Sequence, residues 1–423
     1  MSGDSVTQNR PALRRRTVGV LVGGVALGST GYIAAVTVTS LVAEEIGGDR
    51  SLAGVPAAAV VLGAALGATI LGAVMGRWGR RPGIAAGYGV AVLGALVAIG
   101  GIVAVSLPIV LLGCLAVGFG NSSNQLSRYA AADLYPPDRR GSAIGTVVWA
   151  ATVGAVIGPN LVDPSGGVAV ALGLPRLAGP FLVPLVLVAL AGLLSFSFLR
   201  PDPRELADTS AHRDGNMPAA AIGEIIRRPA VALAVLALVA GQFVMVLIMT
   251  MTPLHMTDHG HALSSVGLVI SAHTFGMFAL APVSGRLTDR FGSLPVIFAG
   301  TTILAASGLL SAVAPPEGEF GLLVALFLLG WGWNLGFVAG SAMLTGGVSA
   351  VERARVQGLA DALIWSTAAI ASLGSGFLLA GAGYTSLGVI GAIIVGLVGG
   401  AFLLGRGALG RPAQAAPLDP IVE

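Results

Sequence analysis

The sequence predicts an all-α membrane protein in which twelve transmembrane helices form two pseudo-symmetric six-helix bundles. The chain has 423 residues, of which 55% are hydrophobic and only 10% are charged, whereas about a quarter of the residues in a soluble domain are charged. Apolar runs of about 20 residues recur along the whole chain, and each can cross a hydrocarbon core of about 30 Å. Short motifs of the first half also return in the second half. A porin-like barrel is excluded, because its strands would be short and alternating.

The first half contains six predicted helices. The first apolar run follows the arginines at 14–16, as in a signal peptide, but it is much longer than the apolar region of about 7–15 residues in such a peptide. We therefore interpret it as an uncleaved span. The segment 163–175 is rich in Pro and Gly and could be a loop or a short interfacial segment. The six helices lie near 17–43, 52–75, 83–106, 108–130, 141–162 and 176–199.

The longest polar stretch, residues 200–229, separates six helices from six more. It contains Pro, Asp and Arg and is suited to a short amphipathic helix on the membrane surface. We expect an N-terminal bundle over 1–199, a cytoplasmic linker over 200–229, and a C-terminal bundle with a short cytoplasmic tail over 230–423. The helices of the second half lie near 230–253, 264–284, 294–314, 320–345, 356–380 and 384–405.

The distribution of arginine predicts the orientation. All 23 basic residues are arginines, and all but Arg50 and Arg176 fall on one side if the N-terminus is cytoplasmic. Cytoplasmic loops carry such an excess of positive charge. We therefore expect a multi-pass protein of the cytoplasmic (inner) membrane with both termini in the cytoplasm.

Several function classes lack support in the sequence. The single cysteine, Cys114, lies in an apolar run and leaves no disulfide framework or CxxC motif. The formal net charge of +3 does not indicate a nucleic-acid partner. The chain contains no P-loop, HExxH or Asp-rich metal motif, so we expect neither an ATP-driven pump nor an enzyme, and no cofactor. Residues 245–277 hold four of the five histidines and five of the nine methionines. These side chains could bind Cu(I), but their spacing matches no specific metal site. The alternative is that they form an exposed cap and pack without binding a metal.

The two halves are repeats of each other. "GAVMGRWGRR" ends the second helix and "GRLTDRFG" the eighth, while "GFGN" lies in the fourth and "GWGWN" in the tenth. Aligning Trp149 with Trp365 also aligns Arg139 with Arg355. A duplicated six-helix unit is the plan of alternating-access transporters, whose substrate site lies between the halves near the midplane.

In these motifs the whole chain resembles the major facilitator superfamily. The loop signature of that family, Gly-x-x-x-Asp-Arg/Lys-x-Gly-Arg/Lys-Arg/Lys, follows helices 2 and 8. The second half matches it at Gly285, Asp289, Arg290 and Gly292. The first half matches at Gly72, Arg77, Gly79, Arg80 and Arg81, but Gly76 stands at the Asp position.

Two further motifs resemble those of the 12-helix drug:proton antiporters. Gly154, Gly158 and Pro159 match the fifth-helix motif Gly-x-x-x-Gly-Pro-x-x-Gly-Gly, although Val162 and Asp163 replace its closing glycines. Gly118 and Gly120 match the fourth-helix motif, but Cys114 occupies its Arg position. The resemblance implies export in exchange for protons.

Asp289 is a predicted conformational latch. An Asp at this cytoplasmic helix end can accept hydrogen bonds from the free N–H groups of a neighbouring helix, which contributes about 0.3–1 kcal/mol. The repeat places that neighbour near residues 140–143. The alternative is a tight positive-inside turn without this role.

The stretch "NSSNQLSR" at 121–128 places polar side chains inside an apolar helix. Asn121, Asn124, Gln125 and Arg128 are spaced i, i+3, i+4 and i+7, so they form one stripe. The resemblance implies that helices 1, 4, 7 and 10 line the central cavity, and buried ionisable groups normally face a cavity or a partner. We interpret the stripe as substrate-binding wall. The alternative is that Arg128 extends to the cytoplasmic headgroups.

Other spans carry polar or aromatic candidates for the same cavity. Gln242 lies in the seventh helix, and Asn334 lies in the tenth, directly after Trp331 and Trp333. The two tryptophans either stack on a flat substrate or simply pack.

Three residues are candidates for carrying a coupling proton: His273, Asp361 and Glu44. His273 lies two to three turns into its span and could titrate near neutrality, or a backbone carbonyl could satisfy it. Asp361 is the only carboxylate in the cytoplasmic half of the eleventh span. We expect it to pair with Arg128 as a gate when the carrier faces outward. If none of the three carries a proton, the carrier is not proton-coupled.

The sequence therefore predicts a secondary active transporter that works by alternating access. Its best-supported activity is proton-coupled efflux of a hydrophobic or amphipathic compound, as in multidrug resistance. Its expected partners are a small-molecule substrate, protons and the lipid bilayer, and we expect a monomer. Uptake of a small polar or anionic metabolite is the alternative, and a membrane sensor that does not transport is the alternative of another class.

Overall fold

The computed structural model describes residues 10–48, 54–206, 222–316, 318–349 and 352–409. Within these ranges every regular element is a helix, which confirms the predicted all-α fold. Eleven helices are long and apolar enough to cross a membrane. The last, α19 (Arg353–Leu409), is broken at Gly383, which has φ 75° and ψ 172°. Because residues on both sides of this break are helical, α19 supplies two crossings, in agreement with the expected total of twelve.

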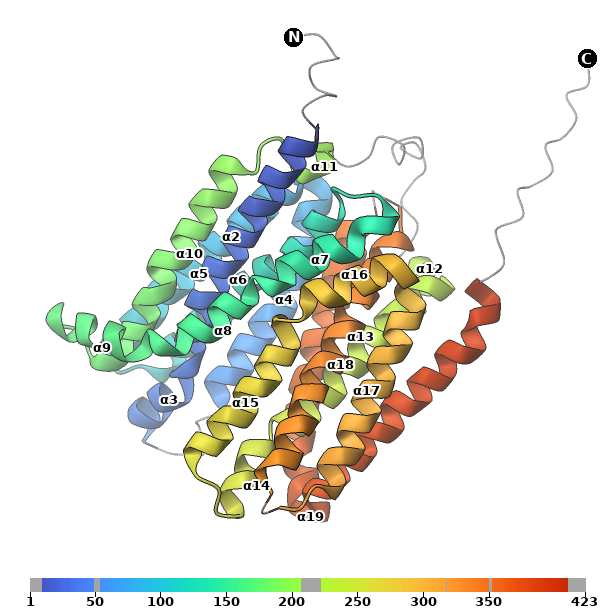
Figure 1. Cartoon of the computed structure of the whole chain (residues 1–423). Helices are drawn as coiled ribbons and strands as arrows, with labels where there is room; N and C mark the ends of the chain where they lie inside the picture. Colours follow the sequence, from blue (N-terminus) through green and yellow to red (C-terminus); the bar gives the residue numbers. More distant parts are fainter. Residues whose placement is uncertain (1–9, 49–53, 207–221, 317, 350–351, 410–423) are drawn as a thin grey trace, which may run out of the picture.

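The helices of the first half follow the expected order, with several broken in two (Figure 1). The first span consists of α2 and α3, and the fifth consists of α7 and α8. The segment 163–175, expected to be a loop or an interfacial segment, contains the helix α9. The bounds are α2 Arg10–Thr37, α3 Thr39–Gly47, α4 Val55–Trp78, α5 Arg80–Val103, α6 Leu107–Ala132, α7 Arg140–Trp149, α8 Ala151–Asn160, α9 Val162–Ala171 and α10 Gly179–Phe198.

The second half begins after the linker, whose middle, 207–221, lies outside the described residues, as do the expected helix start at 52 and the tail from 410. Two short helices, α11 and α12, flank that middle. The eighth span is broken into α15 and α16. The bounds are α11 Pro203–Leu206, α12 Ile222–Ile226, α13 Pro229–Met249, α14 Thr252–Asp258, α15 Leu263–Phe278, α16 Ala281–Phe291, α17 Ser293–Val313 and α18 Glu319–Gly346.

Glycine makes the two signature turns possible. Gly79 joins α4 to α5 with φ 100°, and Gly292 joins α16 to α17 with φ 83°. A side chain at these φ values would strain the backbone. A Cβ atom at Gly79 would in addition lie only 2.6 Å from Oδ2 of Asp202. The glycines of the sequence signature therefore reverse the chain between consecutive spans.

The two halves pack most extensively at two helix pairs. In one pair α4 crosses α19, where a Cβ atom at Gly72 would lie 2.8 Å from Cα of Gly358. In the other pair α7 crosses α16, where a Cβ atom at Gly141 would lie 2.6 Å from the carbonyl oxygen of Gly285. Only glycine permits such close backbone contact.

Both of these crossings lie toward the side of the molecule at which α2 begins and α11 and α12 lie, which we call the linker side. At the other end, α3 and α9 of the first half lie apart from α14 of the second half (Figure 1). The described structure is therefore closed between the halves on the linker side.

Candidate functional site

A cavity of about 150 Å³ lies between the two halves. Larger hollows, of about 590 and 470 Å³, lie on the linker side, but this cavity receives polar side chains from the predicted stripe and aromatic side chains from both halves. It is therefore the candidate substrate site. Its polar and aromatic lining residues are Ser29, Tyr32, Asn121, Asn124, Gln125, Arg128, Phe278, Trp333, Phe337 and Trp365.

The predicted stripe on α6 lines this cavity. All four of its members border the cavity. The amide nitrogen of Asn124 donates to Oδ1 of Asn121 over 2.9 Å, and the hydroxyl of Tyr88 donates to Oδ1 of Asn124 over 2.9 Å. These bonds fix the orientation of both amides, so the cavity wall is held ready to form hydrogen bonds.

Arg128 pairs directly with Asp361 across the two halves. Its Nη1 donates to Oδ2 of Asp361 over 3.1 Å, and its Nη2 donates to Oδ1. Both side chains are about 2% exposed, so Arg128 does not extend to lipid headgroups. The expected contact between these two residues is present, and it joins α6 to α19.

Further donors and acceptors complete the surroundings of this ion pair. Arg128 also donates to Oγ of Ser341 over 3.1 Å, to the backbone oxygen of Gln125 and to the hydroxyl of Tyr129. The Tyr129 hydroxyl lies 3.4 Å from Asp361. Arg128 therefore has several partners besides Asp361, whereas Asp361 depends mainly on Arg128.

A stack of flat groups continues from the ion pair along the cavity. The guanidinium of Arg128 lies 4.2 Å from the ring centres of both Tyr129 and Phe337. Phe337 in turn stacks on Trp333, with ring centres 4.5 Å apart and planes inclined by 18°. The Trp333 indole N–H donates to Oε1 of Gln242 over 2.9 Å. Gln242 thus holds Trp333 in place and does not itself border the cavity.

Two expected substrate-binding residues of α18 lie outside the cavity. Asn334 donates to the carbonyl of Met277 over 2.6 Å and accepts from the hydroxyl of Ser284, so it ties α18 to α15 and α16. Trp331 packs into a separate apolar cluster with residues such as Leu335. Of the two tryptophans, only Trp333 reaches the cavity.

None of the three candidate proton carriers borders the cavity, but Asp361 is joined to it through Arg128. His273 is buried, and its Nδ1 lies 2.9 Å from the carbonyl oxygen of Leu326. Its Nε2 has no hydrogen-bond partner among the described residues. Glu44 is half-buried in α3, at the end of the molecule opposite the linker side. Within the described residues, no three side chains of the metal-binding types gather to hold an ion, and in the histidine-rich segment His255 stacks on Tyr384 at 4.1 Å.

The predicted latch contact is present on the linker side. Oδ1 of Asp289 accepts from the backbone N–H of Gly141 over 2.8 Å, and Oδ2 accepts from that of Ser142 over 2.9 Å. These groups belong to the first turn of α7, where free N–H groups favour a negative charge. Asp289 therefore joins α16 of the second half to α7 of the first half.

The first half uses different residues at the equivalent place, where Gly76 replaces the Asp. Arg80 donates to Asp133 over 2.9 Å and to Oε1 of Gln357, in the second half, over 2.6 Å. Arg353 lies 3.5 Å from Asp133. This cluster was not expected from the sequence.

The remaining signature residues have separate positions. Arg77 lies over the Trp78 ring at 5.3 Å, and Arg290 lies over the Phe291 ring at the same distance. The fifth-helix glycines bring α8 onto α2, because a Cβ atom at Gly154 would lie 2.6 Å from the backbone carbon of Ser29. Pro159 lies within the last turn of α8, and Gly158 faces Ile33 of α2.

Glu352 joins the start of α13 to the start of α19 within the second half. It accepts two hydrogen bonds from Arg228, over 2.9 and 3.1 Å, and others from Ser349. Burial raises the pKa of Glu352, but these hydrogen bonds outweigh burial and hold that pKa at about 2. Glu352 therefore stays ionised at neutral pH.

The comparisons with known proteins agree with this architecture. The family model described as Major Facilitator Superfamily matches residues 20–264 and 242–420. The MFS-type transporter YddS of Bacillus subtilis (strain 168) is 36% identical over 390 residues, which cover 90% of this chain and 89% of that protein. The riboflavin transporter RfnT of Brucella anthropi is 33% identical over 384 residues, which cover 91% and 94%. The crystal structure of the human organic anion transporter MFSD10 has a TM-score of 0.72 at 18% identity, and the match covers 93% of this chain and 99% of that one. The chain therefore belongs to the major facilitator superfamily of membrane transporters.

Proposed function

We propose that this chain exports a small amphipathic molecule with a flat aromatic ring, in exchange for protons, by alternating access. The observation that supports this proposal best is the composition of the cavity between the halves. Its walls combine aromatic faces, such as Trp333 and Phe337, with the fixed amides of Asn121 and Asn124. Such a site can stack a planar ring and bind the polar edge of the same molecule.

The contacts between the halves support alternating access. The latch at Asp289 and the ion pair of Arg128 with Asp361 both join the first half to the second. A substrate cannot reach the linker side while these contacts hold. We propose that they break together when the linker side opens, and that one chain suffices, since the cavity lies within a monomer.

Asp361 is the proposed proton carrier. A proton on its carboxylate removes the negative charge that Arg128 binds and so weakens the ion pair. Entry of a proton from the end opposite the linker would then favour opening on the linker side, where the proton leaves and the substrate enters. Asp361 is more suitable than His273, because it pairs with Arg128, which borders the cavity that the substrate would occupy, whereas His273 lies against the Leu326 carbonyl. Glu44 lies in α3, at the end of the molecule opposite the linker side.

The orientation and direction complete the proposal. The excess of arginine on the linker side supports its placement in the cytoplasm, in the inner membrane. The fifth-helix motif, Gly154 to Pro159, supports export because it resembles the motif of antiporters.

Uptake of a polar planar metabolite is the second candidate. The amide stripe favours it, and the relative RfnT is named a riboflavin transporter. Proteoliposomes with an imposed pH gradient separate the two directions. We expect a fluorescent amphipathic dye, and riboflavin as a second probe, to move against the proton flow. Movement with the proton flow would support uptake instead, and saturable binding of both probes without movement would indicate a sensor.

A comparison of two variants tests the coupling residue. Asp361→Asn should remove the effect of the pH gradient on transport. His273→Gln, whose amide can keep the hydrogen bond to the Leu326 carbonyl, should retain it. The reverse result would identify His273 as the proton carrier.

A further inference from the structure

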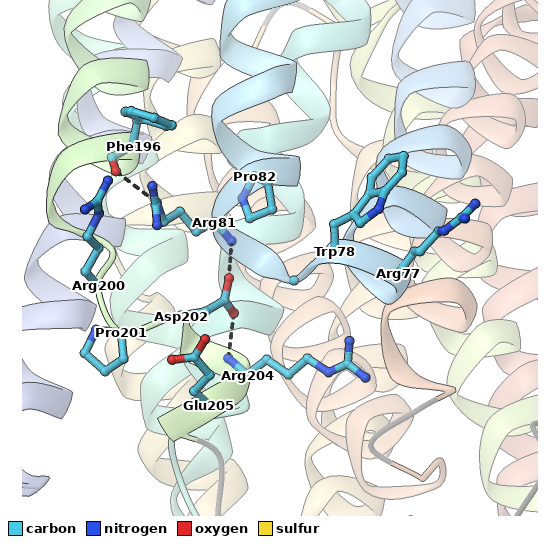
Figure 2. Close-up of a pocket in the computed structure, with 11 residues that line it drawn as sticks. Arg77, Trp78, Arg81, Pro82, Phe196, Arg200, Pro201, Asp202, Arg204 and Glu205 are labelled. Carbon is cyan, nitrogen blue, oxygen red and sulfur yellow. Dashed lines mark hydrogen bonds between the residues drawn. The ribbon is translucent and has the colours of Figure 1, made fainter. Parts of the chain in front are cut away.

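A hollow of about 590 Å³ lies on the linker side, between the first half and the start of the linker. The turn between α4 and α5, the end of α10 and the start of α11 surround it (Figure 2). Four arginines line it, against two acidic residues. The transport cycle proposed above uses none of them as substrate ligands.

Hydrogen bonds fix one wall of this hollow. Asp202 accepts from the backbone N–H groups of Arg80, Arg81 and Arg204, over 3.2, 2.8 and 2.8 Å. Nη1 of Arg204 donates to the carbonyl of Gly76 over 3.0 Å. The start of the linker is therefore bound to the α4–α5 turn, and the charge of Asp202 is already engaged by backbone donors at the first turn of α5.

The side chains of two arginines lie beside Phe196 in the lining of this hollow. Figure 2 shows Arg81 and Arg200 extending toward Phe196 from two different elements. Their guanidinium carbons lie 4.8 and 5.9 Å from the centre of its ring. Arg81 uses only its Nε, which donates to the Phe196 carbonyl over 2.9 Å. Among the described residues, neither arginine forms an ion pair, so their outer N–H groups can bind an anion.

The geometry of guanidinium favours one class of anion. A planar fork of N–H donors matches the oxygens of a phosphate group. Two such forks over one aromatic ring hold their charges on the same side of the hollow. This wall is thus suited to a phosphate group.

An apolar path leads from this wall along α10. Phe196, Leu193 and Leu190 are 53%, 62% and 47% exposed, and their spacing of three residues places them on neighbouring turns of one side of the helix. Because α10 is one of the membrane-spanning helices, these side chains face lipid tails. Trp78 at the rim is 63% exposed, as expected for an aromatic residue at the membrane interface.

We propose that this hollow binds an anionic phospholipid, with the headgroup phosphate between Arg81 and Arg200 and the acyl chains along α10. A basic pocket at the membrane interface is suited to such a headgroup. The continuous apolar path favours a lipid over a free phosphate, which would gain nothing from it. This inference requires only that the chain spans a membrane, and does not depend on the proposed substrate or direction.

Native mass spectrometry of the full chain in detergent tests the site. The affinity for phosphatidylglycerol is compared with that for phosphatidylcholine in the wild type, Arg200→Gln and the double variant with Arg81→Gln. Arg200 forms no hydrogen bond among the described residues, so its replacement should not affect folding, and thermal unfolding checks this. We expect the preference for phosphatidylglycerol to fall about fivefold in the single variant and about 25-fold in the double variant.

Arg227→Gln is the matched control, because Arg227 is exposed on the linker side but does not line the hollow. It should retain the wild-type preference. An equal loss in the control, or a double variant within twofold of the wild type, would overturn the proposal in favour of general surface attraction. Displacement of the lipid by inorganic phosphate at the same concentration as by soluble phosphatidylglycerol would instead show a free-phosphate site, and would also overturn it.

Discussion

Neutralising either member of the Arg128–Asp361 ion pair should open the linker side. The pair joins the two halves and is about 2% exposed, so removal of one partner leaves the other charge buried. This costs about 3–5 kcal/mol in a buried ion pair. If the pair exists only while the linker side is closed, that cost shifts the balance between closed and open states.

The two substitutions should differ in size. After Asp361→Asn, Arg128 keeps Ser341, the Gln125 carbonyl and Tyr129 as acceptors, so we expect the lower limit of about 3 kcal/mol. After Arg128→Gln, the carboxylate of Asp361 keeps only the hydroxyl at 3.4 Å, so we expect a cost near about 5 kcal/mol. At 1.4 kcal/mol for each factor of ten, these shifts are about 10²-fold and at least about 10³-fold toward the open state.

Labelling of a single cysteine measures the shift. Thr345 of α18 is fully buried and donates to the Ser341 carbonyl, so Thr345→Cys should react only when the linker side opens. Cys114, which is also buried, is replaced by Ala to remove background. The rate of reaction with a membrane-impermeant maleimide should rise in both variants, and more in Arg128→Gln.

The reciprocal exchange is the control for this prediction. Arg128→Asp combined with Asp361→Arg restores opposite charges at the two positions, and labelling should slow by at least about tenfold relative to Arg128→Gln. Unchanged labelling in both single variants would refute the role of this pair as a gate.

Three other changes test neighbouring parts of the structure. Asp289→Asn removes the negative charge of the carboxylate that accepts hydrogen bonds from two N–H groups. The equilibrium between the closed and the open linker side should therefore shift about 2- to 30-fold toward the open state in the same labelling assay, with normal membrane insertion; unchanged labelling would contradict the latch. Gln242→Leu leaves the indole N–H of Trp333 without its acceptor, so KM should rise about fivefold or more with little change in kcat, whereas an equal fall in kcat would indicate general damage. The pKa of Glu352 is lowered from 4.5 to about 2, so its stabilising contribution should be complete above about pH 4.5 and disappear as the pH falls toward 2; Glu352→Gln should flatten this part of a plot of Tm against pH.

The fold was predictable because the bilayer sets the length of each apolar run. The breaks inside the spans were predictable only in part. Pro282, in the first turn of α16, cannot continue the helix of α15, so the sequence carries a signal for the break between them. Ala150, between α7 and α8, is not a residue type that interrupts helices, so that break could not be read from the sequence.

The candidate site was predictable where one helix face carries the whole signal. The amide stripe of α6 has a helical period, and Asp361 was the sole acidic candidate near it. Trp331 and Trp333 show the limit of this reasoning. Side chains two residues apart on a helix point in directions about 200° apart. Only one of them can face the cavity.

Two residues of the cavity wall were not predicted from the sequence, although helical spacing points to them. Phe337 lies four residues after Trp333, and Trp365 lies four residues after Asp361, so each shares a helix face with a cavity or gate residue. That spacing could have identified both. The cluster of Arg80, Asp133 and Gln357 could not be found this way, since its members lie in α5, directly after α6 and in α19.

Transport by Asp361→Asn in proteoliposomes tests most directly whether the ion pair couples protons to alternating access. The wild type should show both substrate exchange across the membrane and accumulation driven by an imposed pH gradient. Asp361→Asn can still open and close but can no longer carry the proton. We predict that it retains exchange and loses gradient-driven accumulation. Accumulation at the wild-type rate in Asp361→Asn would contradict the account.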